Sequence, residues 1–334
     1  MEVISVYNNF ANTGGAQDIA LMLAQHFASG KQPMMLTTTS ADNITTEYAG
    51  KADFRPLSLH SFRTIAAEHP GAIFLSHDRK STTRLMIYRM LCRNHAKIVH
   101  VAHSVFDNLR FATLLPRHIV AISSGVRDNL ISYFHIAPER ITFIPNGMLD
   151  AGSRAPRDAH DIRILHIGRI CAVKRQIEIA RTLTGKMPEH TSLHFAGRGE
   201  LEEELRNTVA GLPDTHYIGH IKPAEEIDSF DYVLLCSERE GLPLSLIEAC
   251  MFGKPMITNA LPSVGDINIH GVTGYVCSSD DALIRTVGTL PTPDSDEYRR
   301  LAAGARKRYE QYFGLEKMLS AYDELLNNVA ADRN

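Results

Sequence analysis

The sequence predicts an α/β protein of two domains, each with a doubly wound parallel sheet. Its 334 residues suffice for about two domains of ordinary size, and 44% of them are hydrophobic. Short apolar runs alternate with helical patterns in both halves, which is typical of parallel sheets flanked by helices. We expect a first domain at 1–150, a polar linker with Gly and Pro at 151–161, a second domain at 162–312 and a helical tail at 313–334.

Charge and cysteine content exclude several classes of protein. The formal net charge of −3 argues against a nucleic-acid-binding protein, which needs a basic surface. The five cysteines are scattered and include no Cys-x-x-Cys, so they indicate reduced thiols in a cytoplasmic protein, not a disulfide framework or zinc site. No charged-then-apolar leader and no apolar run of about 18 residues occurs, so any membrane contact is expected to be peripheral.

The first half begins with a strand at 3–7 and a helix at 18–28, joined by a loop that contains Gly14 and Gly15. A Gly-Gly pair lets the backbone approach a ligand closely and directs helix N–H groups at an anion. A tight strand–helix turn would use the same two residues. The other elements expected in this half are strands at 33–37, 73–76, 97–102 and 118–123, and helices at 61–68, 81–93 and 124–134.

Two histidines and a basic segment follow strands of this half. His77 and His103 each end a strand, where a lone histidine more often has a structural role. Residues 79–97 hold six Lys or Arg and no acid, a composition that suits an anionic membrane surface. The basic side chains do not separate cleanly from the apolar ones on a helical wheel, which favours a crossover helix with basic ends over a membrane anchor.

Two cations follow the first strand of the second half. The strand at 162–167 leads into Gly168 and Arg169, with Lys174 five residues further on and a helix from about residue 176. Arg can bind a diphosphate through two parallel hydrogen bonds and Lys adds a point charge, although two solvated charges would give the same pattern. The later Gly197 and Gly199 lack the third glycine of a dinucleotide fingerprint, so they are weak support for NAD binding.

The strand at 232–235 is followed by a loop with Glu240 and a helix that contains Glu248, eight positions further on. Pro243 suits the first turn of this helix, and Gly253 suits its C-terminal end. Burying an unpaired carboxylate costs roughly several kcal/mol, so two of them indicate a hydroxyl-rich ligand that donates hydrogen bonds to both. The alternative interpretation is that the helix dipole stabilises one of these glutamates and that the other is solvated.

The order Glu-Gly-Leu-Pro-Leu-Ser-Leu-Ile-Glu-Ala from Glu240 resembles the E-x7-E motif of retaining glycosyltransferases of family 4, which have the GT-B fold. The loop at Gly14 and Gly15, the Gly-Arg and Lys after 162–167, and the Pro-Asn-Gly at 145–147 are similar to other landmarks of that family. Gln17 departs from it, because the family usually has Glu there. The resemblance covers nearly the whole chain, most specifically residues 163–276, and implies a tail that returns toward the N-terminal domain.

The resemblance implies a metal-independent transferase without a cofactor, which moves a sugar from a UDP- or GDP-sugar to a glycan or lipid-linked acceptor. The implied setting is surface polysaccharide or lipopolysaccharide assembly on the cytoplasmic face of a bacterial membrane. The residues expected to act on the sugar and its leaving group are His103, Arg169, Lys174 and Glu240. The residues expected to bind the donor are Gly14, Gly15, Gly168, Arg169, Lys174, Gly197, Tyr217, Ile218, His220, Gly241, Leu242, Pro243, Leu244 and Glu248.

Other functions remain compatible with these residues. They are a non-catalytic partner that binds a sugar nucleotide, an epimerase of the same fold, and a glycoside hydrolase, which also uses two carboxylates. Asp294 and Asp296 form a literal D-x-D, the metal-binding pattern of GT-A transferases. Pro293 before them and a helix after them favour a loop with a helix cap instead.

Overall fold

The computed structural model describes residues 2–332 and divides the chain into two compact units. The first unit contains the residues up to Asn146 and those from Glu316 onward, and the second contains Gly147–Leu315. Each unit is a Rossmann-like α/β domain with a parallel sheet, so the predicted fold class is confirmed. Among the described residues, no helix is both long enough and apolar enough to cross a membrane.

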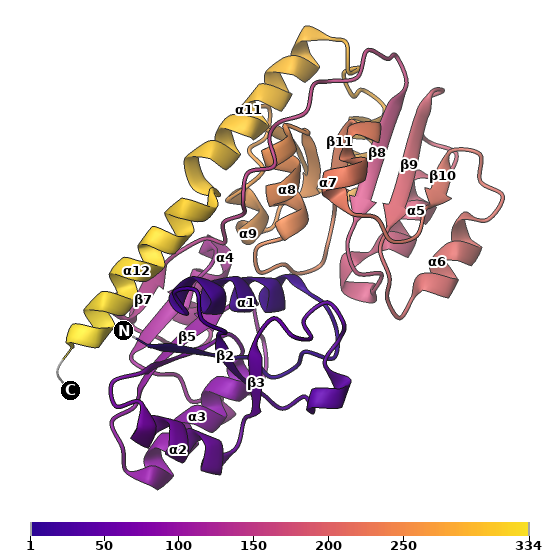
Figure 1. Ribbon diagram of the computed structural model, residues 1–334. Coiled ribbons are helices and arrows are strands. Elements are labelled where there is room, and N and C mark those ends of the chain that lie inside the picture. Colours follow the sequence, from indigo (N-terminus) through magenta and orange to yellow (C-terminus); the bar gives the residue numbers. More distant parts are fainter. Residues whose placement is uncertain (1, 333–334) are drawn as a thin grey trace. The chain divides into compact units, whose positions relative to one another are not determined.

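Within the described residues, the first unit is built on a seven-stranded sheet in the order β3-β2-β1-β4-β5-β6-β7. Figure 1 labels β2, β3, β5 and β7 of this sheet. The strands are β1 (Val3–Val6), β2 (Met34–Thr37), β3 (Asp53–Pro56), β4 (Ile73–Ser76), β5 (Lys97–Ala102), β6 (His118–Ala121) and β7 (Ile141–Phe143). All neighbouring pairs are parallel. The strand order reverses between β1 and β4, and open α/β sheets bind ligands at such a switch point, beyond the carboxyl ends of the strands.

Helices cover both faces of this sheet, because alternate residues of a strand point to opposite faces. Met35 of β2 joins a cluster with Leu21 of α1, whereas Leu36 joins a cluster with Phe62 of α2 and Leu85 of α3. The helices are α1 (Gly15–Phe27), α2 (Leu59–Glu68), α3 (Arg79–Cys92), α4 (Ser124–Ser132) and α12 (Leu315–Ala331). Short 3-10 turns are η1 (Ala41–Asn43), η2 (Arg110–Ala112) and η3 (Pro138–Arg140).

The C-terminal helix α12 packs within the first unit. His26 of α1 lies 3.2 Å from Asp323 through its Nε2 atom, and the Lys97 ammonium donates to the carbonyl of Ala330. The Tyr322 side chain is fully buried. The last helix therefore completes the domain that the first 146 residues begin.

Within its described residues, the second unit has a six-stranded parallel sheet in the order β10-β9-β8-β11-β12-β13. The strands are β8 (Ile162–Ile167), β9 (Thr191–Ala196), β10 (Thr215–Tyr217), β11 (Tyr232–Leu235), β12 (Met256–Asn259) and β13 (Gly274–Cys277). The order reverses between β8 and β11, which places a second switch point there.

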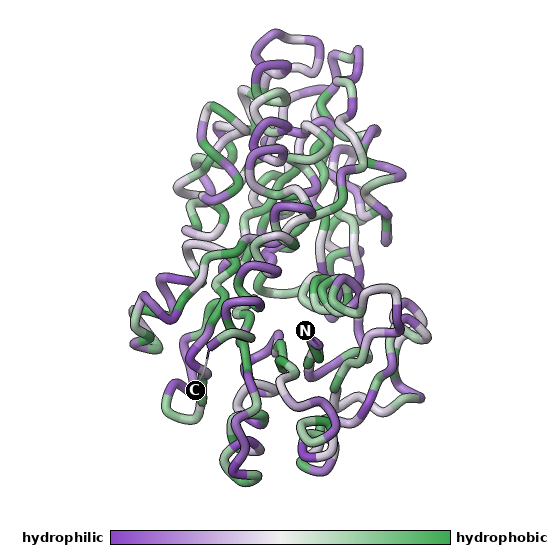
Figure 2. The backbone as a smooth tube through the Cα atoms, turned by 60° about the vertical axis from the view of Figure 1, so that its left-hand side comes forward, coloured by the Kyte–Doolittle hydropathy of each residue, from purple (hydrophilic) through white to green (hydrophobic). Residues whose placement is uncertain are grey.

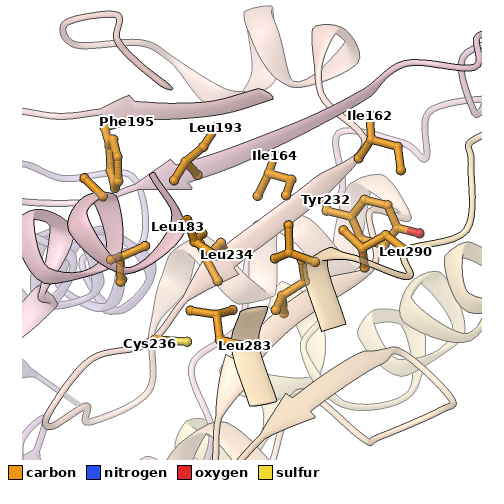
Figure 3. Close-up of a cluster of buried hydrophobic side chains, with 14 of the residues drawn as sticks. Ile162, Ile164, Leu183, Leu193, Phe195, Tyr232, Leu234, Cys236, Leu283 and Leu290 are labelled. Atoms are coloured by element: carbon orange, nitrogen blue, oxygen red, sulfur yellow. The ribbon is translucent and has the colours of Figure 1, made fainter. Parts of the chain in front are cut away.

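The main core of the second unit lies on one face of its sheet. Ile164, Leu193 and Leu234 come from β8, β9 and β11, and they pack against Leu183 of α5 and Leu283 of α10 (Figure 3). Hydrophobic and hydrophilic stretches alternate along the backbone (Figure 2). The helices are α5 (Gln176–Leu183), α6 (Glu202–Val209), α7 (Pro223–Glu226), α8 (Leu244–Phe252), α9 (Pro262–Gly265), α10 (Asp280–Val287) and α11 (Asp296–Tyr312), with 3-10 turns η4 (Ala172–Lys174) and η5 (Ile227–Ser229).

The sequence analysis missed two strands, β3 and β7, at the edges of the first sheet. β3 reads Asp-Phe-Arg-Pro and ends in Pro56, and none of its residues is fully buried. β7 is three residues long and largely exposed. Edge strands pair on one side only and need little apolar surface, so hydrophobic patterning does not reveal them.

Candidate functional site

The switch point of the second sheet brings together two of the predicted residues. Lys174 follows β8 and Glu240 follows β11, the two strands between which the order reverses. The Nζ atom of Lys174 lies 2.6 Å from Oε1 of Glu240, and the two side chains are 19% and 9% exposed. Because this ion pair is poorly hydrated, it is stronger than a pair on the surface. Its two charges lie at the carboxyl edge of the sheet, where a ligand can reach them.

The loop between β8 and Lys174 is shaped by a buried amide that the sequence analysis did not single out. Gln176, 2% exposed, donates from Nε2 to the carbonyl of Arg169 at 2.8 Å, and its Oε1 accepts from the backbone N–H of Cys171 at 3.4 Å. Gly168 begins the loop with a φ of 157°. The Gln176 amide therefore holds the loop backbone at Arg169 and Cys171, and Arg169 itself is exposed.

Glycine is required where β8 and β9 end. A Cβ atom added to Gly197 would lie 1.9 Å from the carbonyl oxygen of Gly168, and one added to Gly199 would lie 2.1 Å from that of Ile170. The two loops are joined by hydrogen bonds from Gly168 N–H to the carbonyl of Ala196 (3.0 Å) and from Ile170 N–H to that of Arg198 (2.9 Å). These contacts, not a dinucleotide fingerprint, explain the two glycines. They also place Arg198, which the sequence analysis did not name, beside the loop of Arg169.

The loop after β10 continues the same edge of the sheet. The Tyr217 hydroxyl donates to the carbonyl of Gly197 at 2.9 Å, and the Gly197 N–H donates to the carbonyl of Gly219 at 2.8 Å. The Arg206 guanidinium lies 4.7 Å from the centre of the Tyr217 ring. Ile218 and His220 are exposed beyond the strand. The loops after β10, β9, β8 and β11 therefore form one continuous rim.

The loop that carries Glu240 is held from both neighbouring strands. The N–H of Glu238 donates to the carbonyl of Val173 at 2.8 Å, which ties it to the loop after β8. From the β12 side, Ser263 Oγ donates to the carbonyl of Glu240 at 2.9 Å, and Asn259 Nδ2 donates to that of Ser237 at 2.7 Å. Sequence reasoning missed Ser263 and Asn259. Asn259 is the last residue of β12 and Ser263 follows that strand, so their place at the same sheet edge is the signal that could have identified them.

The α8 helix presents only one stripe to solvent. It begins at Leu244, with Pro243 as the N-cap residue, so the expectation that Pro243 lies in the first turn is wrong by one position. Gly253 ends the helix with a φ of 70°, as predicted. Leu244, Ser245 and Glu248 are half-buried, whereas the other residues of the helix are buried. Because residues three and four apart share a helix face, Glu248 lies on the same side as the first turn.

A buried histidine lies under the Lys174 loop. His166 of β8 is fully buried, and burial, followed by the nearby Lys174 ammonium, lowers its pKa to about 3. The imidazole is therefore neutral at physiological pH. The positive charge at this switch point thus comes from Lys174 and from the arginines of the rim, and not from the strand beneath them.

In the first unit, Gly14 and Gly15 begin α1 beside the β1 strand. Gln17 donates from Nε2 to the carbonyls of Asn9 (3.3 Å) and Asn12 (3.2 Å), so its amide closes the loop. A Cβ atom on Gly14 would lie 2.8 Å from Oε1 of Gln17. A glutamate at position 17, the residue usual in the resembled family, has no proton to donate to these carbonyls when ionised. A side chain at position 14 would therefore have to displace the Gln17 amide from its place in the loop.

The switch point of the first sheet lies beside this loop. The Asn8 N–H donates to Oδ2 of Asp78 at 2.7 Å, which links the residues after β1 and β4. His77 and His103 directly follow β4 and β5, and the Nδ1 atom of His77 lies 3.2 Å from Nε2 of His103. Burial lowers the pKa of both, that of His103 to about 3. Both rings are neutral, and His103 is the partly exposed one.

The predicted residues thus fall into one set in each unit. In the second unit, the residues at the carboxyl edge of the sheet and at the start of α8 are Gly168, Arg169, Lys174, Gly197, Tyr217, Ile218, His220, Glu240, Gly241, Leu242, Pro243, Leu244 and Glu248. In the first unit, Gly14, Gly15 and His103 lie at the carboxyl edge of the other sheet. Both sets occupy positions that α/β sheets use for ligands.

The D-x-D segment is a helix cap. Ser295 is the N-cap residue of α11, and its Oγ accepts from the N–H of Tyr298 at 3.2 Å. Asp294 lies 3.1 Å from Nδ1 of His160, and Asp296 is in the first helical turn. Across residues 2–332, no group of three or more His, Cys, Asp or Glu side chains is arranged to hold a metal ion.

Comparison with known protein families gives two matches along the chain. The family model of glycosyl transferases group 1 matches residues 154–308, and that of Glycosyltransferase Family 4 matches residues 14–148. The O-antigen biosynthesis glycosyltransferase WbnH of Escherichia coli is 23% identical over 289 residues, which cover 83% of this chain and 82% of WbnH.

Two solved structures have similar folds over their whole length. HepE of Anabaena, determined in complex with UDP, has a TM-score of 0.84 at 15% identity and covers 98% of this chain and 100% of its own. The lipopolysaccharide outer core galactosyltransferase WaaB has a TM-score of 0.79 at 17% identity, with coverages of 98% and 99%. At these identities the likeness establishes the fold, which is GT-B.

Proposed function

The chain carries the Glycosyltransferase Family 4 and glycosyl transferases group 1 domains of a GT-B glycosyltransferase, and we propose that it moves a sugar from a nucleoside-diphosphate donor to a glycan or lipid-linked acceptor with retention of configuration. The observation that carries this proposal is the pairing of Lys174 with Glu240 at the switch point of the second sheet. A cation for phosphate and a carboxylate for sugar hydroxyls lie side by side there. The relationship to WbnH supports a role in surface polysaccharide assembly.

The diphosphate is assigned to the cationic part of the rim. Lys174 and Arg169 follow the same strand, and the start of α8 adds the partial positive charge of a helix N-terminus. In transfer, the bond from the anomeric carbon to the diphosphate oxygen breaks, and negative charge develops on that oxygen. Preorganised cations stabilise this charge electrostatically, so we propose a leaving group that needs no metal ion.

The carboxylates are assigned to hydroxyl groups. Glu240 accepts hydrogen bonds from the transferred sugar, and Glu248, on the half-buried stripe of α8, accepts them from the ribose. The backbone of Gly241, Leu242, Pro243 and Leu244 lies between them. Since each carboxylate accepts two such bonds, a donor lacking these hydroxyls is expected to bind weakly.

Further residues are candidates for contacts with the nucleotide base and with the transferred sugar. Tyr217, Ile218 and His220, beyond β10, are assigned to the base, and the UDP bound to HepE favours uracil over guanine. His103 and the Gly14–Gly15 loop of the first unit are assigned to the transferred sugar and the diphosphate respectively. These are the roles that the family resemblance gives to the matching positions.

Isothermal titration with UDP, GDP and ADP, and with their sugars, tests the donor assignment. We expect one base to bind with micromolar affinity both with and without EDTA, and Lys174→Met to weaken binding. Lys186→Met is the matched control, because Lys186 is exposed and lies away from the rim. If no nucleotide binds, or if binding survives Lys174→Met unchanged, the proposed site is wrong.

Product analysis then separates transfer from its rivals. Transfer gives nucleoside diphosphate in proportion to glycosylated acceptor, whereas a hydrolase gives free sugar with water alone. An epimerase changes the sugar nucleotide without any acceptor, and a binding partner gives no turnover at all. Inversion of the anomeric centre in the product would contradict the retaining mechanism.

We further propose that the first unit contacts an anionic membrane surface peripherally. At the end of α3, Ile87, Met90 and Leu91 are 42%, 68% and 65% exposed, and the basic residues Lys80 and Arg93 of the same segment are also exposed. A helix that carries exposed apolar side chains and exposed basic residues suits an anionic lipid surface. This segment is the crossover helix that the sequence predicted, with an apolar end.

Vesicle flotation tests the membrane contact. We expect binding to vesicles with anionic lipid but not to neutral ones, and loss of binding in Met90→Gln/Leu91→Gln. Leu149→Gln, a change at a side chain that is 73% exposed in the second unit, is the control. Equal flotation of wild type and the double variant would overturn this proposal and leave the transferase proposal untouched.

A further inference from the structure

The histidine pair at the carboxyl edge of the first sheet carries an inference about which nitrogen of His103 holds its proton. His77 follows β4, His103 follows β5, and these strands are parallel neighbours. Their ring planes are inclined by 29° with centroids 5.4 Å apart, and His77 Nδ1 lies 3.2 Å from His103 Nε2. This distance is that of a hydrogen bond, so one of these two nitrogens carries a proton and the other does not.

Both rings are neutral, which limits the arrangement to two possibilities. Burial lowers the pKa of each, and the two rings and the nearby His100 would repel one another if charged. His100 is itself committed elsewhere, because its Nδ1 lies 2.8 Å from Oγ1 of Thr82. A neutral imidazole has one N–H and one lone pair, so the choice made at the shared hydrogen bond determines the outer nitrogen of each ring.

The surroundings of His77 distinguish the two arrangements. His77 is 1% exposed, and its buried Nε2 atom has no hydrogen-bond partner among the described residues. If His103 donated, the proton of His77 would lie on this buried Nε2, where no acceptor is available. If His77 donates from Nδ1, only a lone pair is buried there. A buried N–H without an acceptor is rarer in proteins than a buried lone pair without a donor. The arrangement in which His77 donates from Nδ1 is therefore favoured.

We propose that His77 is a positioning residue that holds His103 in the Nδ1–H tautomer. His103 then presents an N–H donor, and not a lone pair, from its outer nitrogen. That nitrogen makes no hydrogen bond to any described residue, and His103 is partly exposed. The inference rests on the proposed function for its consequence: a neutral donor at this position binds a sugar oxygen, and it does not act as a general base.

Hydrogen bonds to the two chain neighbours of His77 also hold this histidine in place. Thr82 Oγ1, which contacts His100, lies 2.9 Å from both Ser76 Oγ and the carbonyl of Asp78. Ser76 and Asp78 flank His77 in the chain, and Asp78 caps α3 by accepting from the N–H of Ser81 at 2.9 Å. The backbone around His77 is therefore fixed on both sides, which is what a residue needs if it is to orient another.

The tautomer can be read in the free wild-type protein. Long-range 15N–1H correlation NMR of protein labelled with 15N-histidine distinguishes a protonated ring nitrogen from a bare one, and the His103 signals are identified by their loss in His103→Gln. We expect a protonated Nδ1 and a bare Nε2 for His103 near pH 7. A proton on Nε2 of His103 would overturn the proposal, whatever the activity of the protein.

Two variants of His77 link the tautomer to function. His77→Phe removes the donor, so we expect His103 to shift toward the Nε2–H form and kcat to fall about tenfold, the equivalent of one neutral hydrogen bond. His77→Asn retains a donor near the Nδ1 position, and we expect it to restore both the tautomer and kcat. Wild-type kcat in His77→Phe, or a loss in His77→Asn equal to that in His77→Phe, contradicts the positioning role.

The outcome is separable from that of the proposed function. If His103 has the Nδ1–H tautomer but the protein transfers no sugar, the proposed function fails and the histidine arrangement stands. If transfer occurs with the opposite tautomer, the reverse is true. Thermal denaturation of both variants shows whether they are folded, and the wild-type spectrum remains decisive if either is not.

Discussion

The ammonium of Lys174 lies 2.6 Å from the carboxylate of Glu240, although the two residues are separated by 66 positions in the chain. Each is the only charged partner that the described structure gives the other. Under the proposed function, a diphosphate would compete with the Glu240 carboxylate for the same ammonium, so phosphate binding would be coupled to the release of Glu240. The proposal then assigns the released Glu240 to the hydroxyl groups of the sugar.

Glu240→Gln is predicted to separate these two roles. The amide no longer attracts Lys174 as an ion pair, so nucleoside diphosphate without sugar should bind equally well or a few-fold more tightly. Lys174→Met should weaken the same ligand by roughly 10- to 100-fold, the worth of a charge-assisted hydrogen bond. Titration calorimetry with the bare nucleotide checks both. Weaker nucleotide binding in Glu240→Gln would argue that Glu240 holds Lys174 in its binding position.

Gln17→Glu is predicted to destabilise the protein by about 1–2 kcal/mol, because it removes the donors to Asn9 and Asn12 and turns a carboxylate toward their carbonyls. The family resemblance makes glutamate the expected residue here, so the direction of this effect is informative. Gln25→Glu is the matched control, an exposed position on the same helix. Urea denaturation measures the difference. An unchanged midpoint would mean that the loop is held by its other contacts.

Gly197→Ala is predicted to cost more than 2 kcal/mol and to abolish nucleotide binding. The added methyl would lie 1.9 Å from the carbonyl oxygen of Gly168, so the backbone of one loop must move. Gly265→Ala is the control, because a Cβ atom there meets nothing within 4 Å. Circular dichroism and nucleotide titration distinguish the two variants. Normal binding by folded Gly197→Ala would show that the rim tolerates displacement.

Lys254→Met is predicted to leave stability unchanged or to raise it by about 1 kcal/mol. Lys254 is 1% exposed, its Nζ has no hydrogen-bond partner within residues 2–332, and burial lowers its pKa below the usual 10.5. A pKa depressed on folding means that the unfolded state binds the proton more tightly. The penalty is therefore complete below the folded pKa and disappears as pH rises toward 10.5. Melting temperatures of variant and wild type should converge in alkali, and a variant that unfolds more readily at pH 7 contradicts this.

Acid is predicted to destabilise the protein through two buried histidines, His100 and His166, and the partly exposed His103. The pKa of His100 is lowered to about 4 and those of His103 and His166 to about 3, in each case chiefly by burial. Below pH 6.5 these histidines bind protons in the unfolded state but stay neutral in the folded state. The free energy of unfolding therefore falls as pH drops from about 6.5 toward 3. Denaturation at pH 7.5 and 5.0 checks this. The decline should be shallower in His100→Asn and unaltered in the exposed His220→Asn.

The sequence by itself determined the fold class, because the alternation of apolar strands and helical patterns is a local property that each segment carries. It also identified the residues that follow β8 and β11, since a parallel strand places whatever follows it at the carboxyl edge of its sheet. Gly253 as the end of α8 was predictable for the same reason, because a helix ends where its own residues permit it.

Only the tertiary structure decided which of those residues meet. The pairing of Lys174 with Glu240 depends on β8 and β11 being neighbours, and hydrophobic periodicity does not encode strand order. The same holds for His77 with His103, since each looks like an isolated strand-end histidine until β4 and β5 lie side by side. Gln17 and Gln176 were missed as loop supports because their partners are backbone carbonyls, which every sequence has and no pattern marks.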